Sequence, residues 1–249
     1  MQDTVQANQP EGVPPLELTG ERTLPDVPAE NYWFRRHLAV YEWVAERCRG
    51  LHVVDMACGE GYGSAVLART ARRVTGVDAN PEAHAHARAR YNRPGVRFVR
   101  DLVEHHQEPC DAIVFLQTVE HVHDPVELLA RFTEMAEIVY VSTPNVLTLA
   151  PPGAERSDNP WHLREYRPAE FRRLCESVAS SVELRGVFHA RKLRAHELAL
   201  RAGWDRVHGW LGLTSRFYDR FTPAISARDF ALRTGGLDEA LDLVAVIRR

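Results

Sequence analysis

Residues 53–64 read Val-Val-Asp-Met-Ala-Cys-Gly-Glu-Gly-Tyr-Gly-Ser, and this stretch predicts the fold. An apolar run ends at Asp55, and glycines then occupy positions 59, 61 and 63. Because glycine reaches backbone conformations that other residues avoid, the spacing predicts a buried strand that turns sharply into a helix. A turn this bare allows a ligand to touch the backbone.

A second apolar run, residues 73–78, ends at Asp78, nineteen residues after Gly59. An acid at the tip of the second strand is placed to accept hydrogen bonds from both hydroxyls of a ribose. Together, the turn and this acid predict a cofactor that contains adenosine.

The spacing of the turn also discriminates between cofactors. A dinucleotide-binding turn requires glycine at its first, third and sixth positions, and the sixth position after Gly59 is Ser64. Glu60 lies inside the turn, where a carboxylate would repel a pyrophosphate. S-adenosylmethionine has no phosphate and carries a cationic sulfonium and ammonium, so the sequence favours it over NAD.

The turn resembles the first motif of the class I S-adenosylmethionine-dependent methyltransferases, which commonly reads Asp-x-Gly-Cys-Gly-x-Gly. Here Ala57 replaces the first glycine. The resemblance implies a Rossmann-like, doubly wound α/β fold with a seven-stranded sheet of order 3-2-1-4-5-7-6. It also implies an N-terminal lid segment, and the chain has room for a C-terminal helical insertion.

The periodicity of the chain agrees with this fold class. Alternating strands and helices of this length indicate parallel strands joined by right-handed crossovers. Strands are expected at 51–56, 73–78, 96–100, 111–116, 138–142, 181–189 and 241–248, and helices at 32–49, 61–72, 81–91, 124–135 and 168–178.

The chain divides into three regions. Residues 1–19 are rich in glutamine and proline and predict a disordered tail. Residues 20–249 form one methyltransferase domain. Within it, residues 190–240 are too long for a hairpin loop and contain helical stretches, several aromatic residues and several arginines. We expect this insertion to cap the substrate side.

Composition excludes several classes of function. The 249 residues have a formal net charge of −3, which gives no electrostatic footprint for nucleic acid. The polar N-terminus is unlike a signal peptide and no run approaches eighteen apolar residues, so we expect a cytoplasmic protein that does not engage membranes. The four cysteines have no CxxC spacing, which argues against a zinc cluster or a disulfide framework.

Ligands of open α/β sheets bind outside the carboxyl ends of the strands. Asp101 and Leu102 match the positions that contact the adenine in the family. Alternatively, Asp101 only caps a short helix. Arg36 or His37 is expected to meet the carboxylate of the cofactor. The predicted cofactor contacts are His37, Asp55, Gly59, Glu60, Gly61, Asp78, Ala79, Asp101, Leu102 and Gln117.

The segment after the fourth strand supplies the candidate catalytic residues. An alcohol cannot lose its proton unaided near pH 7, and a histidine is the natural acceptor. His121 is the candidate base, Glu120 is placed to orient its ring, and His162 is a second candidate base. The alternative is a purely structural role, in which His121 only packs against the following helix.

The same segment resembles small-molecule O-methyltransferases, some of which bind a divalent metal through this Glu-His pair and an earlier acid. The earlier position here is Gln117, which is not an acid. Magnesium prefers carboxylates, so it is only a candidate second cofactor.

Residues 159–166 suit a carbohydrate acceptor, because the Trp161 ring offers a flat apolar face and the polar neighbours can bind hydroxyls. Alternatively, this loop is merely anchored by its own tryptophan. The predicted substrate contacts are Tyr32, Trp33, Trp161, Arg164, Glu165, His189 and Arg191.

Several of these segments together resemble an actinobacterial branch associated with sugar O-methylation in mycobacterial methylglucose and methylmannose polysaccharides. We therefore predict O-methylation of a saccharide or related polar small molecule, by a chain that is a candidate homodimer. Two alternatives stay open. The acceptor is a natural-product amine or phenol, or the chain binds the cofactor without transferring a methyl group.

Overall fold

The computed structural model describes residues 23–249 apart from residues 152, 211 and 213, together with a few isolated positions before residue 23. The side chains of residues 205 and 208 are also outside the description. The predicted tail, residues 1–19, therefore lies mostly outside the described residues, and its disorder stays a prediction.

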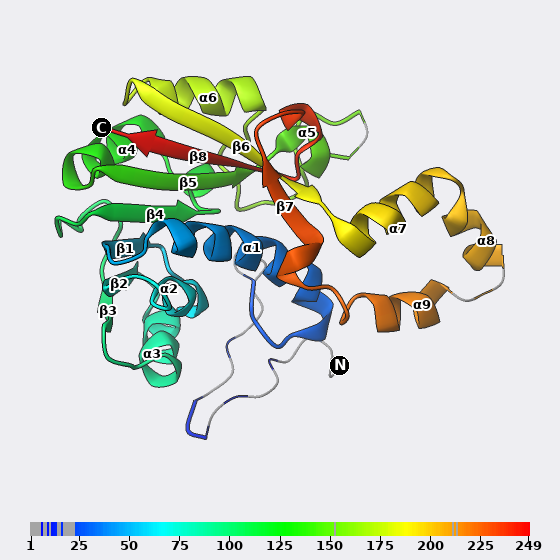
Figure 1. Cartoon of the computed structure of the whole chain (residues 1–249), viewed down its shortest axis with the longest axis horizontal. Coiled ribbons are helices and arrows are strands. Elements are labelled where there is room, and N and C mark those ends of the chain that lie inside the picture. The colour runs from blue at the N-terminus through cyan, green and yellow to red at the C-terminus, as the bar shows by residue number, and fades with distance from the viewer. Residues whose placement is uncertain are drawn as a thin grey trace.

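The described residues form an eight-stranded sheet of order β3-β2-β1-β4-β5-β8-β6-β7 (Figure 1). The first five strands run parallel, and β8 pairs antiparallel with both β5 and β6. This confirms the predicted doubly wound α/β fold and the insertion of the last strand beside the fifth. The strands are β1 (His52–Met56), β2 (Arg73–Asp78), β3 (Val96–Arg100), β4 (Ala112–Leu116), β5 (Ile138–Pro144), β6 (Ser181–His189), β7 (Phe230–Arg233) and β8 (Asp242–Arg248).

One strand of the sheet was not predicted. β7 has only four residues and pairs with β6 from Gly186 to His189, at the edge of the sheet. Its short run carries too little alternation to be recognised inside residues 190–240. The sheet therefore has eight strands and not the predicted seven.

The helices on the sheet are α1 (Asn31–Arg47), α2 (Tyr62–Leu67), α3 (Pro81–Arg90), α4 (Pro125–Met135), α5 (Val146–Leu149) and α6 (Pro168–Glu176). α2 is shorter than the predicted helix 61–72. Beyond its end, the Thr70 hydroxyl donates to the Ala45 carbonyl, and the Thr70 carbonyl accepts from the Gly50 amide. These bonds to the last turn of α1 and to the segment that follows it draw the chain out of the helix.

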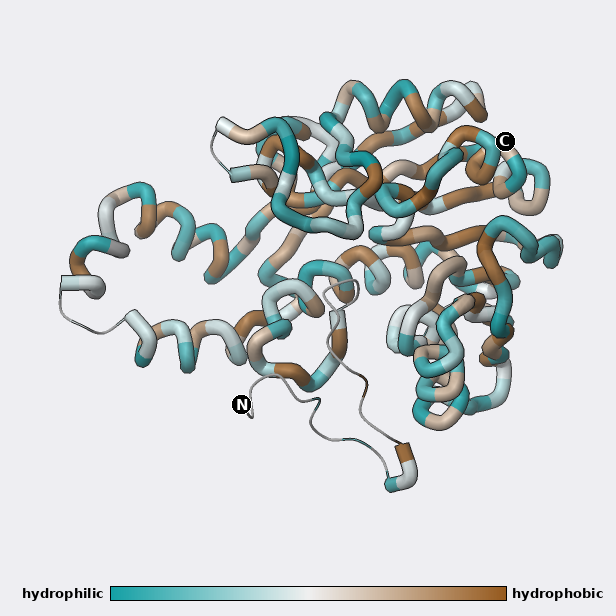
Figure 2. The backbone as a smooth tube through the Cα atoms, turned by 180° about the vertical axis from the view of Figure 1, so that it is seen from behind, coloured by the Kyte–Doolittle hydropathy of each residue, from teal (hydrophilic) through white to brown (hydrophobic). Residues whose placement is uncertain are grey.

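Two hydrophobic layers hold the sheet. α1 and α2 pack on one face through residues such as Leu38, Val44 and Leu67. α4 and α6 pack on the other face, where Phe132 and Phe171 are almost fully buried. Figure 2 shows the brown, hydrophobic backbone concentrated along the central strands, while the helices alternate between brown and teal.

The segment 190–240 has two parts. The helices α7 (Arg191–Arg201), α8 (Trp204–Trp210) and α9 (Thr214–Phe221) extend away from the sheet as an arm (Figure 1). The short turn η3 (Ala227–Asp229) and β7 instead return to the body and contact α1. No described residue of this segment lines either cavity presented below, so its role as a substrate cap stays a prediction.

In the described part of the chain, no helix has the length and apolar character needed to cross a bilayer.

A buried ion pair joins α1 to the start of β8. The Arg36 guanidinium donates from Nε to Asp242 Oδ2 over 2.6 Å and from a terminal nitrogen to Asp242 Oδ1. The same nitrogen donates to the Leu241 carbonyl over 2.6 Å. Both side chains are almost fully enclosed, so each charge depends on the other.

Replacing Asp242 should therefore be costly. We expect Asp242→Ala to lower the free energy of unfolding by about 3–5 kcal/mol, because Arg36 keeps a buried charge without a partner. Urea denaturation followed by circular dichroism measures this. Glu46→Gln is the control, because it breaks an ion pair with Arg49 whose side chains are 66% and 68% exposed. It should change stability by less than about 0.5 kcal/mol. Equal losses in the two variants would contradict this role.

Candidate active site

The glycine turn lies between β1 and α2, as predicted. Gly59 and Gly61 have φ angles of +56° and +95°, in the left-handed region. A Cβ on Gly61 would lie 2.9 Å from the Ala87 Cβ and 2.9 Å from the Phe98 ring. Glycine at 61 is therefore required by both conformation and space.

Asp78 anchors this turn to the tip of β2. Its carboxylate accepts hydrogen bonds from the Gly59 amide over 2.8 Å and from the Asn80 amide over 2.9 Å. Asp78 also lines the cavity beside the turn, together with Ala79. The contact of Asp78 with a ribose stays a prediction.

Asp55 lies behind the turn and does not line the cavity. Its fully buried carboxylate accepts hydrogen bonds from the Tyr41 hydroxyl over 3.2 Å and the Ser64 hydroxyl over 2.7 Å. Burial raises the pKa of Asp55 to about 7. The structure thus places Asp55 as a support of the turn and not at the predicted cofactor surface.

Glu60 also turns its carboxylate away from the cavity. One oxygen lies 3.1 Å from Nε2 of His86, and the other accepts from the Tyr91 hydroxyl over 3.3 Å. Both Glu60 and His86 are almost completely buried. The charge that was expected to face the cofactor is therefore directed at α3 and at Tyr91, the residue that follows it.

The cavity beside the turn has a volume of about 580 Å³. Its walls include most of the predicted cofactor residues, namely His37, Gly59, Glu60, Asp78, Ala79, Leu102 and Gln117. Asp101 and Gly61 are not among its lining residues. The Asp101 carboxylate accepts from the Leu102 amide over 2.9 Å. Residues 103–105 form a turn and not a helix, so the structure does not show the alternative in which Asp101 caps a short helix.

Residues that sequence reasoning missed complete this cavity. Ser142, at the end of β5, accepts hydrogen bonds at Oγ from the Gln117 backbone amide over 3.1 Å and from its Nε2 over 3.0 Å. Gln117 is held there with a φ angle of +54°. Tyr41 and Tyr62 add aromatic wall. The helical periodicity of α1 indicated that Tyr41 is buried, but not that it faces the cofactor side.

His37 lines the cavity from α1, and its Nδ1 lies 3.2 Å from the Thr23 hydroxyl. Burial lowers the pKa of His37 to about 4. A neutral imidazole would offer the carboxylate of a cofactor a hydrogen bond and not a full charge. The other predicted partner, Arg36, is committed to Asp242.

A second cavity of about 280 Å³ adjoins the first. The two share Thr23, His37, Gln117 and His121 as walls. The second cavity is otherwise lined by Glu30, Trp33, Arg36, Glu120, Pro144, Leu149, Asn159 and His162. It therefore brings the three candidate catalytic residues together next to the larger cavity.

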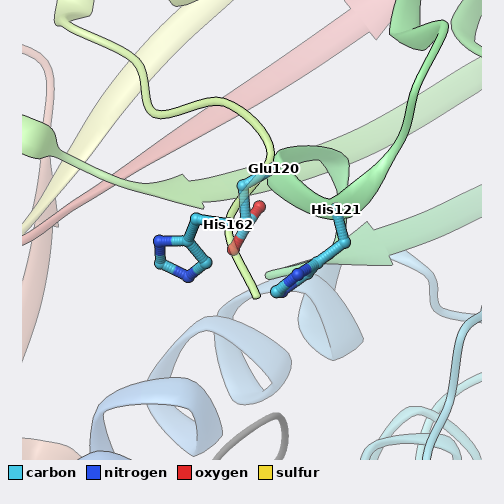
Figure 3. Close-up of side chains that lie close together, drawn as sticks. All are labelled: Glu120, His121 and His162. Carbon is cyan, nitrogen blue, oxygen red and sulfur yellow. The ribbon is translucent and has the colours of Figure 1, made fainter. Parts of the chain in front are cut away.

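Glu120, His121 and His162 offer atoms that all lie within 4.8 Å of one another (Figure 3). His121 and Glu120 belong to the short turn η2 (Val119–His121) after β4, and His162 lies on the loop before α6. Nδ1 of His121 lies 2.8 Å from the Trp161 carbonyl. A carbonyl only accepts, so Nδ1 carries the proton and Nε2 of the neutral ring carries the lone pair. The Trp161 carbonyl, and not the predicted Glu120, fixes this ring.

The second histidine is oriented in a similar way. Nδ1 of His162 lies 2.7 Å from the Glu165 carboxylate, and its Nε2 lies 3.0 Å from the Asn159 amide nitrogen. Glu165 is also bonded to Ser157, which helps to lower the Glu165 pKa although burial opposes the shift. Glu165 was predicted to contact substrate, and the structure uses it to hold His162.

Four other predicted substrate residues do not line either cavity. The Tyr32 hydroxyl lies 2.8 Å from Nε2 of His189, so these two satisfy each other. The Arg164 guanidinium lies over the Tyr166 ring at 5.2 Å, and Arg191 is exposed at the start of α7. Trp33 and Trp161 do line cavities, as predicted.

A model of the methyltransferase domain family matches residues 30–198 of this chain. A probable S-adenosylmethionine-dependent methyltransferase of Mycolicibacterium smegmatis is 37% identical over 249 residues, covering 94% of this chain and 95% of the relative. The chain belongs to the S-adenosylmethionine-dependent methyltransferases.

Other comparisons agree with membership of this methyltransferase family. A probable S-adenosylmethionine-dependent methyltransferase of Mycobacterium tuberculosis is 34% identical, covering 94% of this chain and 90% of the relative. A ubiquinone biosynthesis O-methyltransferase of Xylella fastidiosa is 34% identical over 43% of this chain and 48% of its own length. A Thermotoga maritima methyltransferase structure, described as a possible histamine N-methyltransferase, has a TM-score of 0.56. It is 13% identical, covering 88% of this chain and 93% of the other, and therefore supports the fold alone.

The position of Asp78 predicts a measurable effect on cofactor affinity. Asp78→Asn retains an oxygen for the Gly59 amide but removes the charge, and should weaken binding of S-adenosylhomocysteine by about 10- to 100-fold. Isothermal titration calorimetry measures this. Asp101→Asn is the matched control, because it removes the same charge at the next strand tip outside the cavity. It should change the affinity by less than about threefold. Equal effects would show that the adenine-reading role of Asp101 is real.

The buried carboxyl of Glu120 should make the free energy of unfolding depend on pH. Burial raises the pKa of its carboxyl from 4.5 to about 8, so the folded state binds more protons than the unfolded state between these values. The resulting stability is fully present below pH 4.5 and is lost as pH rises through 8. Glu120→Gln should therefore gain stability relative to the wild type between pH 5 and 9, by more than about 1.4 kcal/mol.

Urea denaturation in the presence of a chelator tests this pH dependence. Glu134→Gln, an exposed position on α4, is the control and should show no such trend. A pH-independent difference between Glu120→Gln and the wild type would mean that Glu120 titrates normally.

Proposed function

We propose that this methyltransferase transfers a methyl group to a hydroxyl of a saccharide or a related polar small molecule. The proposal depends mainly on His121, which lines both cavities and stands where they meet. The larger cavity would hold S-adenosylmethionine against Gly59 and Asp78, and the smaller cavity would hold the acceptor.

The chemistry requires alignment and a base. The acceptor oxygen attacks the methyl carbon while the carbon–sulfur bond breaks, and the electron pair of that bond stays on sulfur to give S-adenosylhomocysteine. The hydroxyl proton passes to Nε2 of His121 and then to solvent. Because the Trp161 carbonyl holds the Nδ1 proton, Nε2 is the nitrogen with the lone pair for this role.

The lining of the smaller cavity supports a polar acceptor. Glu30, Arg36, Asn159 and His162 offer donors and acceptors for hydroxyl groups, and the Trp33 indole adds an apolar wall. Trp161 is 50% exposed at the rim of the larger cavity, which suits stacking against a sugar ring. The sequence resemblance to sugar O-methyltransferases points in the same direction.

A phenolic acceptor is the second candidate. Leu163 and Leu102 are each 47% exposed and line the larger cavity beside Trp161, giving an apolar rim that suits an aromatic ring. A phenol ionises near pH 10, so its methylation would depend less on a base than that of an alcohol.

His121→Ala tests the proposal. With a labelled methyl donor and a panel of mono- and disaccharides, we expect turnover to fall by about 10²–10⁴-fold while affinity for S-adenosylhomocysteine is retained. His123→Ala, at an exposed position two residues away, is the control and should keep wild-type turnover. If His121→Ala keeps its rate and the rate is flat between about pH 6 and 9, the phenolic acceptor is favoured.

A further inference from the structure

We infer that Glu120, His121 and His162 together bind one divalent transition-metal ion. The three side chains offer ligand atoms within 4.8 Å of one another and meet at the wall of the smaller cavity (Figure 3). Two imidazoles and one carboxylate are a sufficient protein ligand set for such an ion, with further positions left for water or an acceptor oxygen. The inference rests on the proposed function only for its kinetic consequence.

The hydrogen bonds around the histidines have the pattern of metal-binding imidazoles. Such a histidine usually donates its second ring N–H to a carbonyl or carboxylate, which fixes the ring and leaves the other nitrogen to the metal. His121 does this through the Trp161 carbonyl at 2.8 Å, and His162 through the Glu165 carboxylate at 2.7 Å. In both rings the lone pair is therefore on Nε2.

Glu120 supplies a second and independent observation. The residue is only 1% exposed, and its Oε2 has no hydrogen-bond partner among the described residues. Buried carboxylate oxygens are nearly always paired, because removal from water without compensation is costly. A cation between this oxygen and the two histidines would provide the missing partner.

The ligand set selects the class of metal. Magnesium prefers oxygen ligands and retains several waters, whereas imidazole nitrogens suit zinc, cobalt and similar ions. Gln117, which stands where related methyltransferases have an acid, directs its amide to Ser142. His162 from the distant loop takes the third place instead, so the site should favour zinc over magnesium.

The side chain of Asn159 occupies the nitrogen of His162 that the ion would bind, and this provides a further test. Its amide nitrogen lies 3.0 Å from Nε2 of His162, on the lone pair that the ion would take. The Asn159 side-chain oxygen also accepts from the Trp161 amide over 3.0 Å. Binding therefore displaces the Asn159 amide from His162. Removing that amide by Asn159→Asp, which keeps an oxygen for Trp161, should strengthen metal binding.

The ion and the acceptor proton would compete for the same nitrogen of His121. A bound zinc ion should therefore lower the turnover that depends on His121 as base. An increase of turnover on adding zinc would instead show that His121 is not the proton acceptor. The presence of the metal site would still be decided by the binding measurements described below.

The test titrates the full-length, tag-free and chelator-treated protein with Zn²⁺, Co²⁺ and Mg²⁺, without cofactor or acceptor. We expect one tightly bound Zn²⁺, visible d–d absorption from the Co²⁺ complex, and Mg²⁺ affinity at least about 100-fold lower than that of Zn²⁺. Because these are binding measurements, their result does not depend on whether a saccharide is the acceptor.

Variants assign the ion to this cluster. His162→Ala and Glu120→Gln should each weaken Zn²⁺ binding by at least about tenfold, Glu165→Gln should weaken it to a smaller extent, and Asn159→Asp should tighten it. His123→Ala is the control and should bind as the wild type does. Unchanged Zn²⁺ affinity in His162→Ala, or equal affinity for Mg²⁺ and Zn²⁺ in the wild type, would overturn the inference.

Discussion

The buried ion pair between Arg36 and Asp242 is the interaction on which the geometry of this methyltransferase most depends. Asp242 begins β8 opposite Pro144, the last residue of β5, so it lies at the sheet edge where the parallel strands end. An enclosed guanidinium must keep its counter-charge. The pair therefore holds α1 across this edge and brings Trp33 and His37 to the two cavities.

Behind the exposed backbone of the glycine turn lie buried polar groups that face one another. Asp55 is held by Tyr41 and Ser64, and Glu60 faces His86. These contacts fix the turn before any ligand arrives, which lowers the conformational cost of binding. They also explain why several charged residues near the turn do not themselves face the cavity.

Most of the fold and the glycine turn with its neighbouring acid could be predicted from the sequence. Strand periodicity, glycine spacing and the acid at position 78 are short-range features that a local pattern reveals. Contacts between distant segments were not predictable from the same signals. Tyr32 satisfies His189, 157 positions away, and a tyrosine looks the same in sequence whether its partner is protein or substrate. Glu165 was misjudged for this reason. The helix α2 ends early because Thr70 bonds to the last turn of α1, and β7 is too short to show alternation.

The walls of the two cavities come from different stretches of the chain. Residues 57–62, 78–80 and 102–104 contribute walls to the larger cavity but not to the smaller one, whereas Glu30, Trp33, Pro144, Leu149 and Asn159 line the smaller cavity but not the larger one. Substitutions among the residues that line only the smaller cavity can therefore reshape that cavity and leave the walls of the larger one unchanged. The architecture lets one cavity diverge in evolution while the other is inherited intact.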